Sequence, residues 1–399
     1  MASSPAAVPS AQAALPRVLL LTCFALCVAN VVWLAAMYAQ GHFFLDSLGR
    51  PKPADFVNVW AAGRLVLDGQ AAAAYDWAIH KTVESKAVGY EFAEYYGWHY
   101  PPPYLFIATV LALFPYPAAF LLWLAVTLPL FLVVVRWIVG HPSGWLIAAG
   151  MPAILTNLVV GQNGFLTASL IGGTLGFMQK QPVLSGTCLG LLTYKPQFGL
   201  LFPIVLIAAR QWTVFATASI VGTAVALASW AAFGTETWQA FFDWLPVTSK
   251  AVLSEGRADL GRQQSIFAFV RVLGGAEALA WTAQIVVAVA TAAGLCFLWR
   301  SRAPFELKAA ALAAGTLLAT PYVYLYDVVV LAVAAAFLVR LGLAHGFRRY
   351  EPGVLAATAV LLSSFPFVDA PVALGATLII VLLVVLRASH GLARSRSIQ

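Results

Sequence analysis

Long apolar runs, separated by short polar or Pro/Gly breaks, make up most of the chain. By the hydropathy criterion these runs predict about twelve membrane-spanning helices. The predicted spans are 18–40, 117–139, 145–159, 164–179, 183–193, 197–209, 212–233, 277–299, 306–319, 325–342, 353–365 and 371–388. Several are shorter than the roughly 17–25 residues of a full span, so either their ends extend through the breaks or some of the helices are broken.

Two long segments, 41–103 and 234–262, interrupt this pattern. Helical patterns inside them predict short helices near 55–68, 77–96 and 236–253. Two short apolar stretches, 104–114 and 265–273, are typical of half-spans or interfacial helices. The predicted organisation is a single transmembrane domain, 18–388, between a disordered tail, 1–17, and a basic tail, 389–399.

The composition agrees with this interpretation. The chain of 399 residues is 61% hydrophobic and only 10% charged, with a mean hydropathy of +0.85. A soluble fold of this length could not bury so much apolar surface, so the predicted class is an all-α polytopic membrane protein. The four cysteines lie inside apolar runs without a CxxC motif, which indicates neither a disulfide framework nor a zinc site.

The net charge of +7 raises the question of nucleic acid, but the positions of the charges argue against it. With the N-terminus in the cytoplasm and alternating spans, thirteen basic residues fall on the inside, with only Glu306 and Glu351 as acids. These basic residues are Arg17, Arg136, Lys180, Arg210, Arg300, Arg302, Lys308, Arg340, Arg348, Arg349, Arg387, Arg394 and Arg396. Short inner loops rich in Lys and Arg are typical of membrane topology and of contacts with anionic lipids, so both termini are predicted to be cytoplasmic.

The unusual motifs fall almost entirely on the predicted outer ends. They are KPADFVNVWAAG (52–63), GWHYPPPY (97–104), GQNG (161–164), TYKPQ (193–197) and TPYVYLYD (320–327). A scaffold has no reason to collect polar and aromatic breaks on one side of a membrane. Their distribution therefore predicts a functional site at the outer face.

Asp55 is the first candidate for chemistry. It follows Pro53 and begins a helical pattern that contains Trp60, so one interpretation is a helix N-cap, a role that Asp fills well. A carboxylate beside an aromatic side chain at headgroup level is also partly desolvated, which raises its pKa towards the range of a general base. The two roles are compatible. Asp68, before Gly69, and Asp76, as an N-cap, are interpreted as structural.

Other candidates could contact a phosphate or a sugar. His99 and Tyr100 lie at the edge of a rigid proline turn, where the favoured interpretation is an aromatic belt and the alternative is contact with a substrate phosphate or sugar. Lys195 lies between two apolar runs. Insertion of a lysine into the hydrocarbon region costs roughly 2.5–3.5 kcal/mol of free energy. Its side chain is therefore expected either to extend to the membrane interface or to hold a phosphate. Candidate hydrogen-bonding and phosphate-binding partners are Gln162, Asn163, Gln197, Arg257 and Arg262.

Tyr324 and Asp327 lie at the outer end of a predicted span, where an acid is expensive and therefore functional by default, although it could also pair with an outer cation. The chain lacks the P-loop, zinc-protease, nucleophile-elbow and dinucleotide motifs. His42, His80 and His99 share the outer side without ligand-like spacing. No metal site and no cofactor are therefore predicted.

The order of these motifs, from Asp55 through YPPP, GQNG and KPQ to the final tyrosine-rich PY…YD, resembles glycosyltransferase family 87, a group of polytopic GT-C-type enzymes. The resemblance implies an inverting transfer of a sugar, mannose in the best-known relatives, from a polyprenyl-phosphate donor to a lipid or glycan acceptor. It implies Asp55 as the general base and a site on the periplasmic or extracellular face of the plasma membrane. The donor phosphate would be offset by Lys195, Arg257, Arg262 or Arg64 rather than by a metal.

Two alternatives remain open on the sequence. A transporter or flippase of lipid-linked sugars would place polar groups near the bilayer midplane, often with an internal repeat, and would depend on Asp327 rather than Asp55. A non-catalytic subunit of an envelope assembly would tolerate a charge-neutral change at Asp55.

Overall fold

The computed structural model describes residues 14–255, 260–368 and 370–396, and in these ranges the fold is helical, with no strand beyond two isolated bridges. The first half contains α1 (Arg17–Ala39), α2 (Phe56–Leu67), η1 (Ala71–Tyr75), α3 (Trp77–Val88), η2 (Pro102–Tyr104), α4 (Leu105–Ala112), α5 (Tyr116–Val139), α6 (Gly144–Ala149), α7 (Ala153–Val160), α8 (Gly164–Phe177) and α9 (Pro182–Leu191). The second half contains η3 (Leu192–Tyr194), η4 (Pro196–Phe198), α10 (Leu201–Ala208), α11 (Trp212–Ser249), η5 (Lys250–Ser254), η6 (Leu260–Arg262), α12 (Ile266–Val272), α13 (Glu277–Arg300), α14 (Phe305–Ala319), η7 (Leu325–Val329), α15 (Val330–His345), α16 (Glu351–Ser363), η8 (Phe365–Phe367) and α17 (Val372–Arg396). The all-α prediction is confirmed for this part of the chain.

Among the described residues, six helices are long and apolar enough to cross a membrane. They are Arg17–Ala39, Tyr116–Val139, Trp212–Ser254, Glu277–Arg300, Leu325–His345 and Val372–Ser389. The predicted count of twelve is not confirmed, because the other apolar helices are short. The predicted span 145–159, for example, is divided into α6 and α7 by a break that contains Gly150 and Pro152, since proline lacks the N–H that helix continuation requires.

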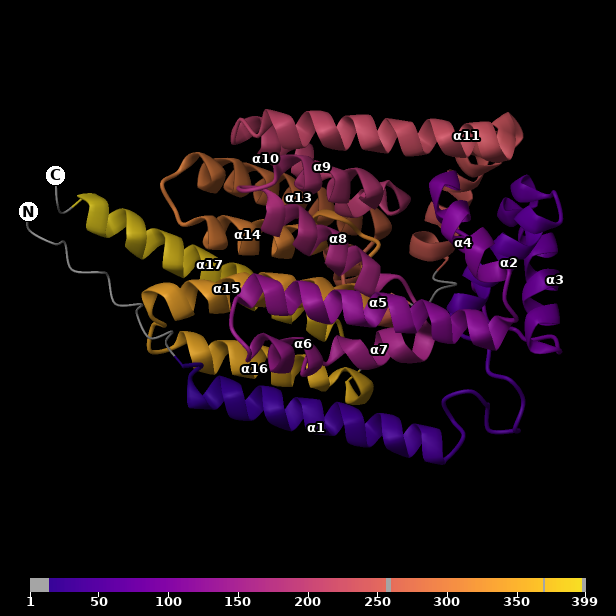
Figure 1. Ribbon diagram of the computed structural model, residues 1–399, viewed down its shortest axis with the longest axis horizontal. Coiled ribbons are helices and arrows are strands. Elements are labelled where there is room, and N and C mark those ends of the chain that lie inside the picture. Colours follow the sequence, from indigo (N-terminus) through magenta and orange to yellow (C-terminus); the bar gives the residue numbers. More distant parts are fainter. Residues whose placement is uncertain (1–13, 256–259, 369, 397–399) are drawn as a thin grey trace, which may run out of the picture.

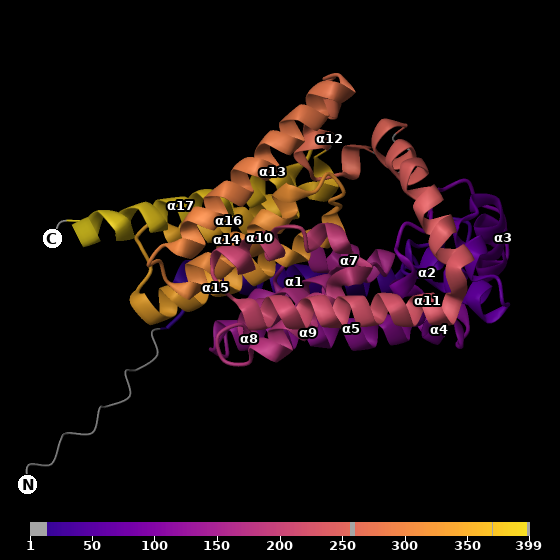
Figure 2. The same ribbon diagram turned by 90° about the horizontal axis from the view of Figure 1, so that it is seen from above.

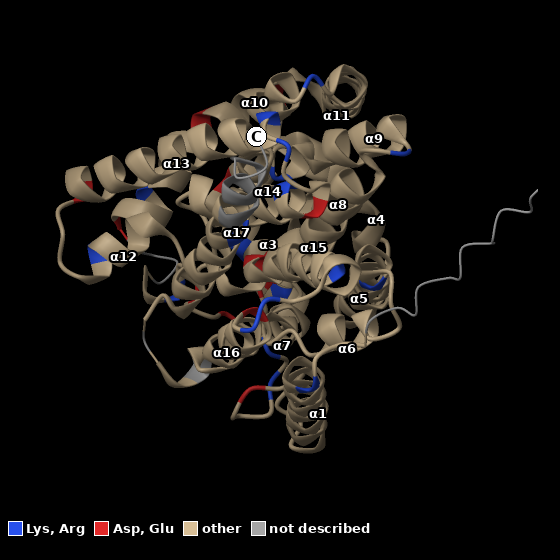
Figure 3. Ribbon diagram, turned by 90° about the vertical axis from the view of Figure 1, so that its left-hand side faces the viewer, with Lys and Arg blue, Asp and Glu red and all other residues tan. Residues whose placement is uncertain are grey.

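Most of the long helices share a common direction, and the short helices α2, α3 and α4 gather at one end of the molecule (Figure 1). The beginning of α1 and the end of α17 lie at the opposite end. Figure 3 looks onto that opposite end and shows Lys and Arg on several helix ends there. The fold thus places the helices of segment 41–103 far from the beginning of α1 and the end of α17.

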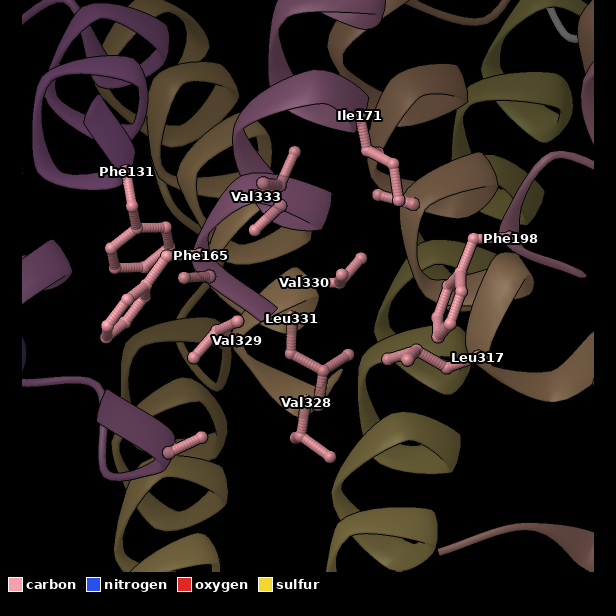
Figure 4. Close-up of a cluster of buried hydrophobic side chains, with 14 of the residues drawn as sticks. Phe131, Phe165, Ile171, Phe198, Leu317, Val328, Val329, Val330, Leu331 and Val333 are labelled. Atoms are coloured by element: carbon pink, nitrogen blue, oxygen red, sulfur yellow. The ribbon is translucent and has the colours of Figure 1, made fainter. Parts of the chain in front are cut away.

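The buried core lies around α5, α8, α14 and α15. Phe131 of α5 and Phe165 of α8 have ring centroids 5.4 Å apart, and both are fully buried. Figure 4 shows these rings beside Val329 of η7, and Phe198 of η4 beside Leu317 of α14. Because α8 follows the GQNG turn and α15 follows the YVYLYD segment, this core fixes the positions of both motifs.

Helices form in both long segments, 41–103 and 234–262, but not all of them have the predicted ends. Segment 55–68 forms α2, but α3 ends at Val88 rather than near 96, because Gly89 adopts a left-handed conformation with φ +85°. Gly234, with φ +80°, introduces a kink into α11, where the sequence predicts a break between a span and an outer helix (Figure 2). At Gly63, a Cβ would lie 2.0 Å from the Ala108 carbonyl oxygen, so this glycine lets α2 pack closely on α4.

Candidate active site

Asp55 lies immediately before α2, and its side chain does not cap the helix. The residue itself has helical backbone angles, and none of its hydrogen bonds is a side-chain cap. Asp76, in contrast, accepts hydrogen bonds from Ala78 N and Ile79 N at 2.9 and 3.1 Å and is a true N-cap. The N-cap interpretation is therefore confirmed for Asp76, whereas the half-buried carboxylate of Asp55 remains available for another role.

A chain of hydrogen bonds connects Asp55 to two of the other motifs. Gln162 Nε2 donates to Asp55 Oδ2 at 3.4 Å, and Tyr100 Oη donates to Gln162 Oε1 at 2.9 Å. Tyr75 Oη in turn donates to the Tyr100 carbonyl at 2.8 Å. The fold therefore brings segment 41–103, with its YPPP turn, and the GQNG turn together around one carboxylate.

A second group of contacts surrounds Lys195, which is only 3% exposed. Its Nζ donates to Asp327 Oδ1 at 2.5 Å and to Asn163 Oδ1 at 2.8 Å. Asp327 is fully buried, and its other oxygen accepts from Tyr324 N at 3.1 Å. Of the two interpretations of Asp327, the structure shows the ion pair, with Lys195 as the cation. Since Gln162 and Asn163 are consecutive, the GQNG turn joins this ion pair to the Asp55 chain.

The shape of the GQNG turn explains its two glycines. Gly161 has φ +66° and ends α7 in the left-handed conformation. Gly164 faces the YVYLYD segment so closely that a Cβ would lie 2.1 Å from the Tyr326 carbonyl oxygen. Asn157 completes the contact, donating to the Tyr326 carbonyl at 2.6 Å and accepting from Gly164 N at 3.1 Å.

We expect Gly164→Ala to lower the free energy of unfolding by about 1–3 kcal/mol, because the added methyl forces the GQNG turn away from Tyr326. Gly353→Ala in α16 is the matched control, since no atom of the described residues lies within 4 Å of a Cβ there. Thermal unfolding of the two purified variants in detergent measures the difference. Equal unfolding temperatures would show that the turn can move at little cost.

The surroundings of Asp55 make it more basic than an ordinary aspartate. Burial raises the pKa of its carboxyl to about 6. The hydrogen bond from Gln162 and the positive charge of Arg262 oppose the rise, and the negative charge of Glu84 adds to it. A carboxyl with this pKa is ionised at neutral pH and accepts a proton more readily than an exposed one.

His99 connects the YPPP turn to the end of α11 rather than to Asp55. Its Nδ1 lies 3.0 Å from Thr248 Oγ1, and its ring stacks on Trp244 with centroids 6.4 Å apart. Burial and the charge of His80 lower the pKa of His99 to about 4, so the imidazole is neutral at neutral pH. As a neutral group it offers a phosphate or sugar a hydrogen bond but no charge.

The remaining predicted site residues are more dispersed. Trp60 donates its indole N–H to the Phe114 carbonyl at 2.9 Å and packs edge-on against Tyr116. Arg64 forms an ion pair with Asp68 at 3.1 Å on the exposed side of α2, which agrees with a structural Asp68. Gln197 is half-buried in η4 beside Lys195.

The predicted site residues from the second half of the chain lie in segment 234–262 and after it. Arg262 is exposed at the end of η6, and its charge acts on Asp55. Tyr324 stacks on Tyr326, with centroids 5.5 Å apart, and pairs through its backbone with Gln263. Arg257 lies outside the described residues.

Three buried polar residues at this end of the molecule were not among the predicted site residues. Asn157 holds the GQNG turn against Tyr326. His80 and Glu84 of α3 are 1% and 0% exposed, with His80 Nε2 3.4 Å from Glu84 Oε1. Their spacing of four residues puts them on one helix face, but an exposed surface pair has the same spacing, so the sequence carried no signal of their burial.

In chemical terms, the described part of the site offers one carboxylate with a raised pKa, the Gln162 amide that orients it, and the positive charge of Arg262. No group of three His, Cys, Asp or Glu side chains that could hold a metal occurs among the described residues. A carboxylate with these surroundings can accept a proton from a hydroxyl group.

Comparison with known proteins gives one match. The model of glycosyltransferase family 87 matches residues 98–321, more than half of the chain. This segment contains Tyr100, Gln162, Asn163, Lys195 and Arg262, whereas Asp55 precedes it and Asp327 follows it. Neither the curated proteins nor the solved structures that were compared give a match. The matched segment carries the turns that assemble around Asp55, and the chain belongs to glycosyltransferase family 87.

Proposed function

We propose that this glycosyltransferase moves a hexose, such as mannose, from a polyprenyl-phosphate donor to a hydroxyl group of a lipid or glycan acceptor, with inversion at the anomeric carbon. The observation that carries the proposal is the state of Asp55. Its carboxylate is oriented by Gln162, is not used as a cap, and has a pKa raised to about 6. These are the properties of a general base that works near neutral pH.

The proposed reaction is a single displacement. The acceptor O–H gives its proton to Asp55 Oδ, and the acceptor oxygen forms a bond to the anomeric carbon. The bond from that carbon to the phosphate oxygen breaks, and its electron pair leaves with the polyprenyl phosphate. Attack and departure on opposite faces of the sugar produce the inverted product.

The donor phosphate needs positive charge or hydrogen-bond donors near Asp55. Arg262 supports this role best, because it is exposed and its charge acts on Asp55. The Arg guanidinium also matches phosphate geometry. Lys195 is less suited, because it is buried and Asp327 neutralises its charge. We propose that Lys195 and Asp327, together with Asn163, instead hold the GQNG turn and the YVYLYD segment together.

The same architecture supports a location for the reaction. Asp55 belongs to the end of the molecule that holds α2–α4, and the basic helix ends lie at the opposite end, with the beginning of α1 and the end of α17 (Figures 1 and 3). Because basic residues favour the cytoplasmic side, we propose cytoplasmic termini in the plasma membrane and a site at its outer face. A donor whose lipid chain stays in the membrane can reach this end from the bilayer.

The proposal is tested by transfer of radiolabelled sugar from polyprenyl-phosphate donors to lipid or glycan acceptors in membranes that contain the protein. Appearance of labelled product with release of polyprenyl phosphate supports a glycosyltransferase of this donor class. Transfer from a nucleotide sugar in the absence of polyprenyl phosphate would contradict the proposed donor.

The pKa of Asp55 predicts the pH dependence of this transfer. The base must be ionised to accept a proton, and its pKa of about 6 means that it is protonated below that pH. We expect kcat/KM to fall about tenfold per pH unit below pH 6 and to reach a plateau above pH 7. A profile that is flat between pH 5 and 7 would contradict Asp55 as the base. Sugar release from the donor without acceptor, measured in parallel, controls for acid hydrolysis.

A further inference from the structure

The connecting segment, residues 89–101, joins α3 to η2 without forming a helix or strand. Such a segment has no helical hydrogen bonds of its own, so its position depends on contacts with its neighbours. It leads into the YPPP turn, where Tyr100 donates to Gln162, the amide that contacts Asp55. The groups that hold this segment in place therefore bear on the candidate active site.

Lys81 of α3 binds the connecting segment through its ammonium group. Lys81 Nζ donates to the Glu94 carbonyl at 2.6 Å and lies 3.2 Å from the centroid of the Phe92 ring. The ring centroids of Trp77 and Tyr96 are 5.5 and 5.9 Å from the same nitrogen. A cation within about 6 Å of an aromatic face is attracted to it, so one ammonium gathers three rings and a carbonyl.

A buried carboxylate completes the surroundings of this ammonium. Glu84 Oε2 lies 3.6 Å from Lys81 Nζ, and the two side chains are 0% and 19% exposed. Lys86 of the same helix is exposed to solvent. Fixing a long lysine side chain costs rotamer entropy, which a solvated lysine avoids. The contacts of Lys81 therefore indicate a lysine that holds other groups in place rather than one that extends into water.

The connecting segment contacts the backbone on both sides of Asp55. Before Asp55, Tyr96 Oη donates to the Pro53 carbonyl at 3.3 Å. After it, Asn58 Nδ2 donates to the Gly97 carbonyl at 3.5 Å, and Asn58 N donates to the Asp55 carbonyl at 3.2 Å. The Tyr96 ring is also one of the faces beside the ammonium. A series of direct contacts thus leads from the ammonium through the segment to the residues that flank the carboxylate.

We propose that Lys81 is a positioning residue, which holds the connecting segment against the backbone on both sides of Asp55 and so fixes the carboxylate for proton transfer. This inference rests on the proposed function, because it gives Lys81 a part in the same reaction. A base must lie within hydrogen-bond reach of the hydroxyl proton, and a displacement of about 1 Å can cost about a hundredfold in rate. Loss of Lys81 therefore lowers kcat and leaves KM for the donor nearly unchanged.

The first test follows the segment itself and needs no enzymatic turnover. Glu91 and Glu94 are exposed, and the peptide bond after Glu94 contains the carbonyl that Lys81 holds. In the full-length protein in detergent, a glutamyl endopeptidase should cut after these residues about tenfold faster in Lys81→Met than in wild type. Lys81→Arg, which keeps the cation, should be cut at nearly the wild-type rate. Equal rates in Lys81→Met and in the control Lys86→Met overturn the proposal.

Two further variants separate detachment of the segment from a general loss of stability, because Lys81→Met alone leaves Glu84 buried without this cation. Lys81→Met combined with Glu84→Gln removes the buried charge together with the cation. Phe92→Leu removes the nearest of the three aromatic faces and keeps both charges. Both variants should remain folded in thermal unfolding and be cut faster than wild type after Glu94. Cleavage of both at the wild-type rate contradicts the proposal.

The second test measures kcat and KM for a polyprenyl-phosphate sugar donor. Lys81→Met with Glu84→Gln should lower kcat by about tenfold or more, with KM changed by less than about twofold. Lys81→Arg should keep most of the wild-type kcat, and Lys86→Met all of it. A wild-type kcat in a variant whose segment is cut faster would show that the segment does not position Asp55, and the proposal would fail.

Failure of the proposed function gives a different pattern. If wild type transfers no sugar from any polyprenyl-phosphate donor, the proposed function fails, and the cleavage series alone decides whether Lys81 holds the segment. If wild type transfers sugar and kcat does not respond to Lys81, only the further inference fails.

Discussion

Asp55→Asn should reduce sugar transfer by about 10²–10⁴-fold while leaving the protein folded. Asparagine keeps the size of the side chain, and its amide oxygen can still accept the hydrogen bond from Gln162 Nε2. It cannot accept the acceptor proton. The change removes a half-buried carboxylate whose pKa burial has raised, so no stabilising charge is lost with it. Transfer from a polyprenyl-phosphate donor measures the effect.

The matched control is Asp68→Asn, an exposed carboxylate at the other end of α2 that pairs with Arg64. This variant should transfer sugar at nearly the wild-type rate. Equal activity of Asp55→Asn and wild type would remove Asp55 from the chemistry and favour the non-catalytic alternative. Movement of lipid-linked sugar across the membrane without transfer, and its loss in Asp327→Asn, would favour the flippase.

Lys195→Met should destabilise the protein strongly, with a loss of about 3–5 kcal/mol in the free energy of unfolding. Lys195 is 3% exposed, and its ammonium is bonded to Asp327 and Asn163. Methionine fills a similar volume but leaves the fully buried carboxylate of Asp327 without its cation. Thermal unfolding in detergent, with the amount of folded protein in the membrane, measures the loss.

Two further variants test whether the loss of stability comes from breaking the ion pair or from removing a lysine side chain. Lys180→Met removes an exposed lysine that follows α8 and should leave the unfolding temperature unchanged. The double variant Lys195→Met with Asp327→Asn should regain most of the loss, because no unpaired charge remains while the bond from Tyr324 N is kept. A double variant as unstable as Lys195→Met alone would show that the ion pair is not what Lys195 contributes.

Much of the architecture follows from local patterns in the sequence. The many long apolar runs predict membrane-spanning helices, because a helix hydrogen-bonds its own backbone N–H and C=O groups where lipid offers no partners. Left-handed glycines mark real boundaries, as at Gly234 in α11 and at Gly161 after α7. The boundary at Gly89 was missed because a helical pattern continues past it in the sequence, although the backbone does not. The number of full spans was overestimated because hydropathy measures apolar character and not the length of an unbroken helix.

For the candidate site, too, the sequence predicted one part and the tertiary structure decided the rest. Along the chain, the breaks rich in Lys and Arg alternate with the breaks that carry the aromatic and polar motifs. This alternation can be read from the sequence, and it grouped Asp55, Tyr100, Gln162 and Lys195 at one end of the molecule. Which of them touch is decided by packing between elements more than a hundred residues apart, such as Gln162 on Asp55 and Asp327 on Lys195. No local pattern specifies those contacts.

The charge state of each group is likewise a tertiary property. The sequence presents Lys195 as a candidate cation for a phosphate and does not indicate that Glu84 is buried. In both cases the charge state depends on burial and on partners that are distant in the sequence. The fold neutralises Lys195 with Asp327 and buries Glu84 in α3. Sequence therefore determined the membrane-protein class, most of the helices and the set of motifs that come together. Only the tertiary structure decided which carboxylate pairs with a cation and which is oriented by an amide, because desolvation and pairing arise from residues that the chain brings together from a distance.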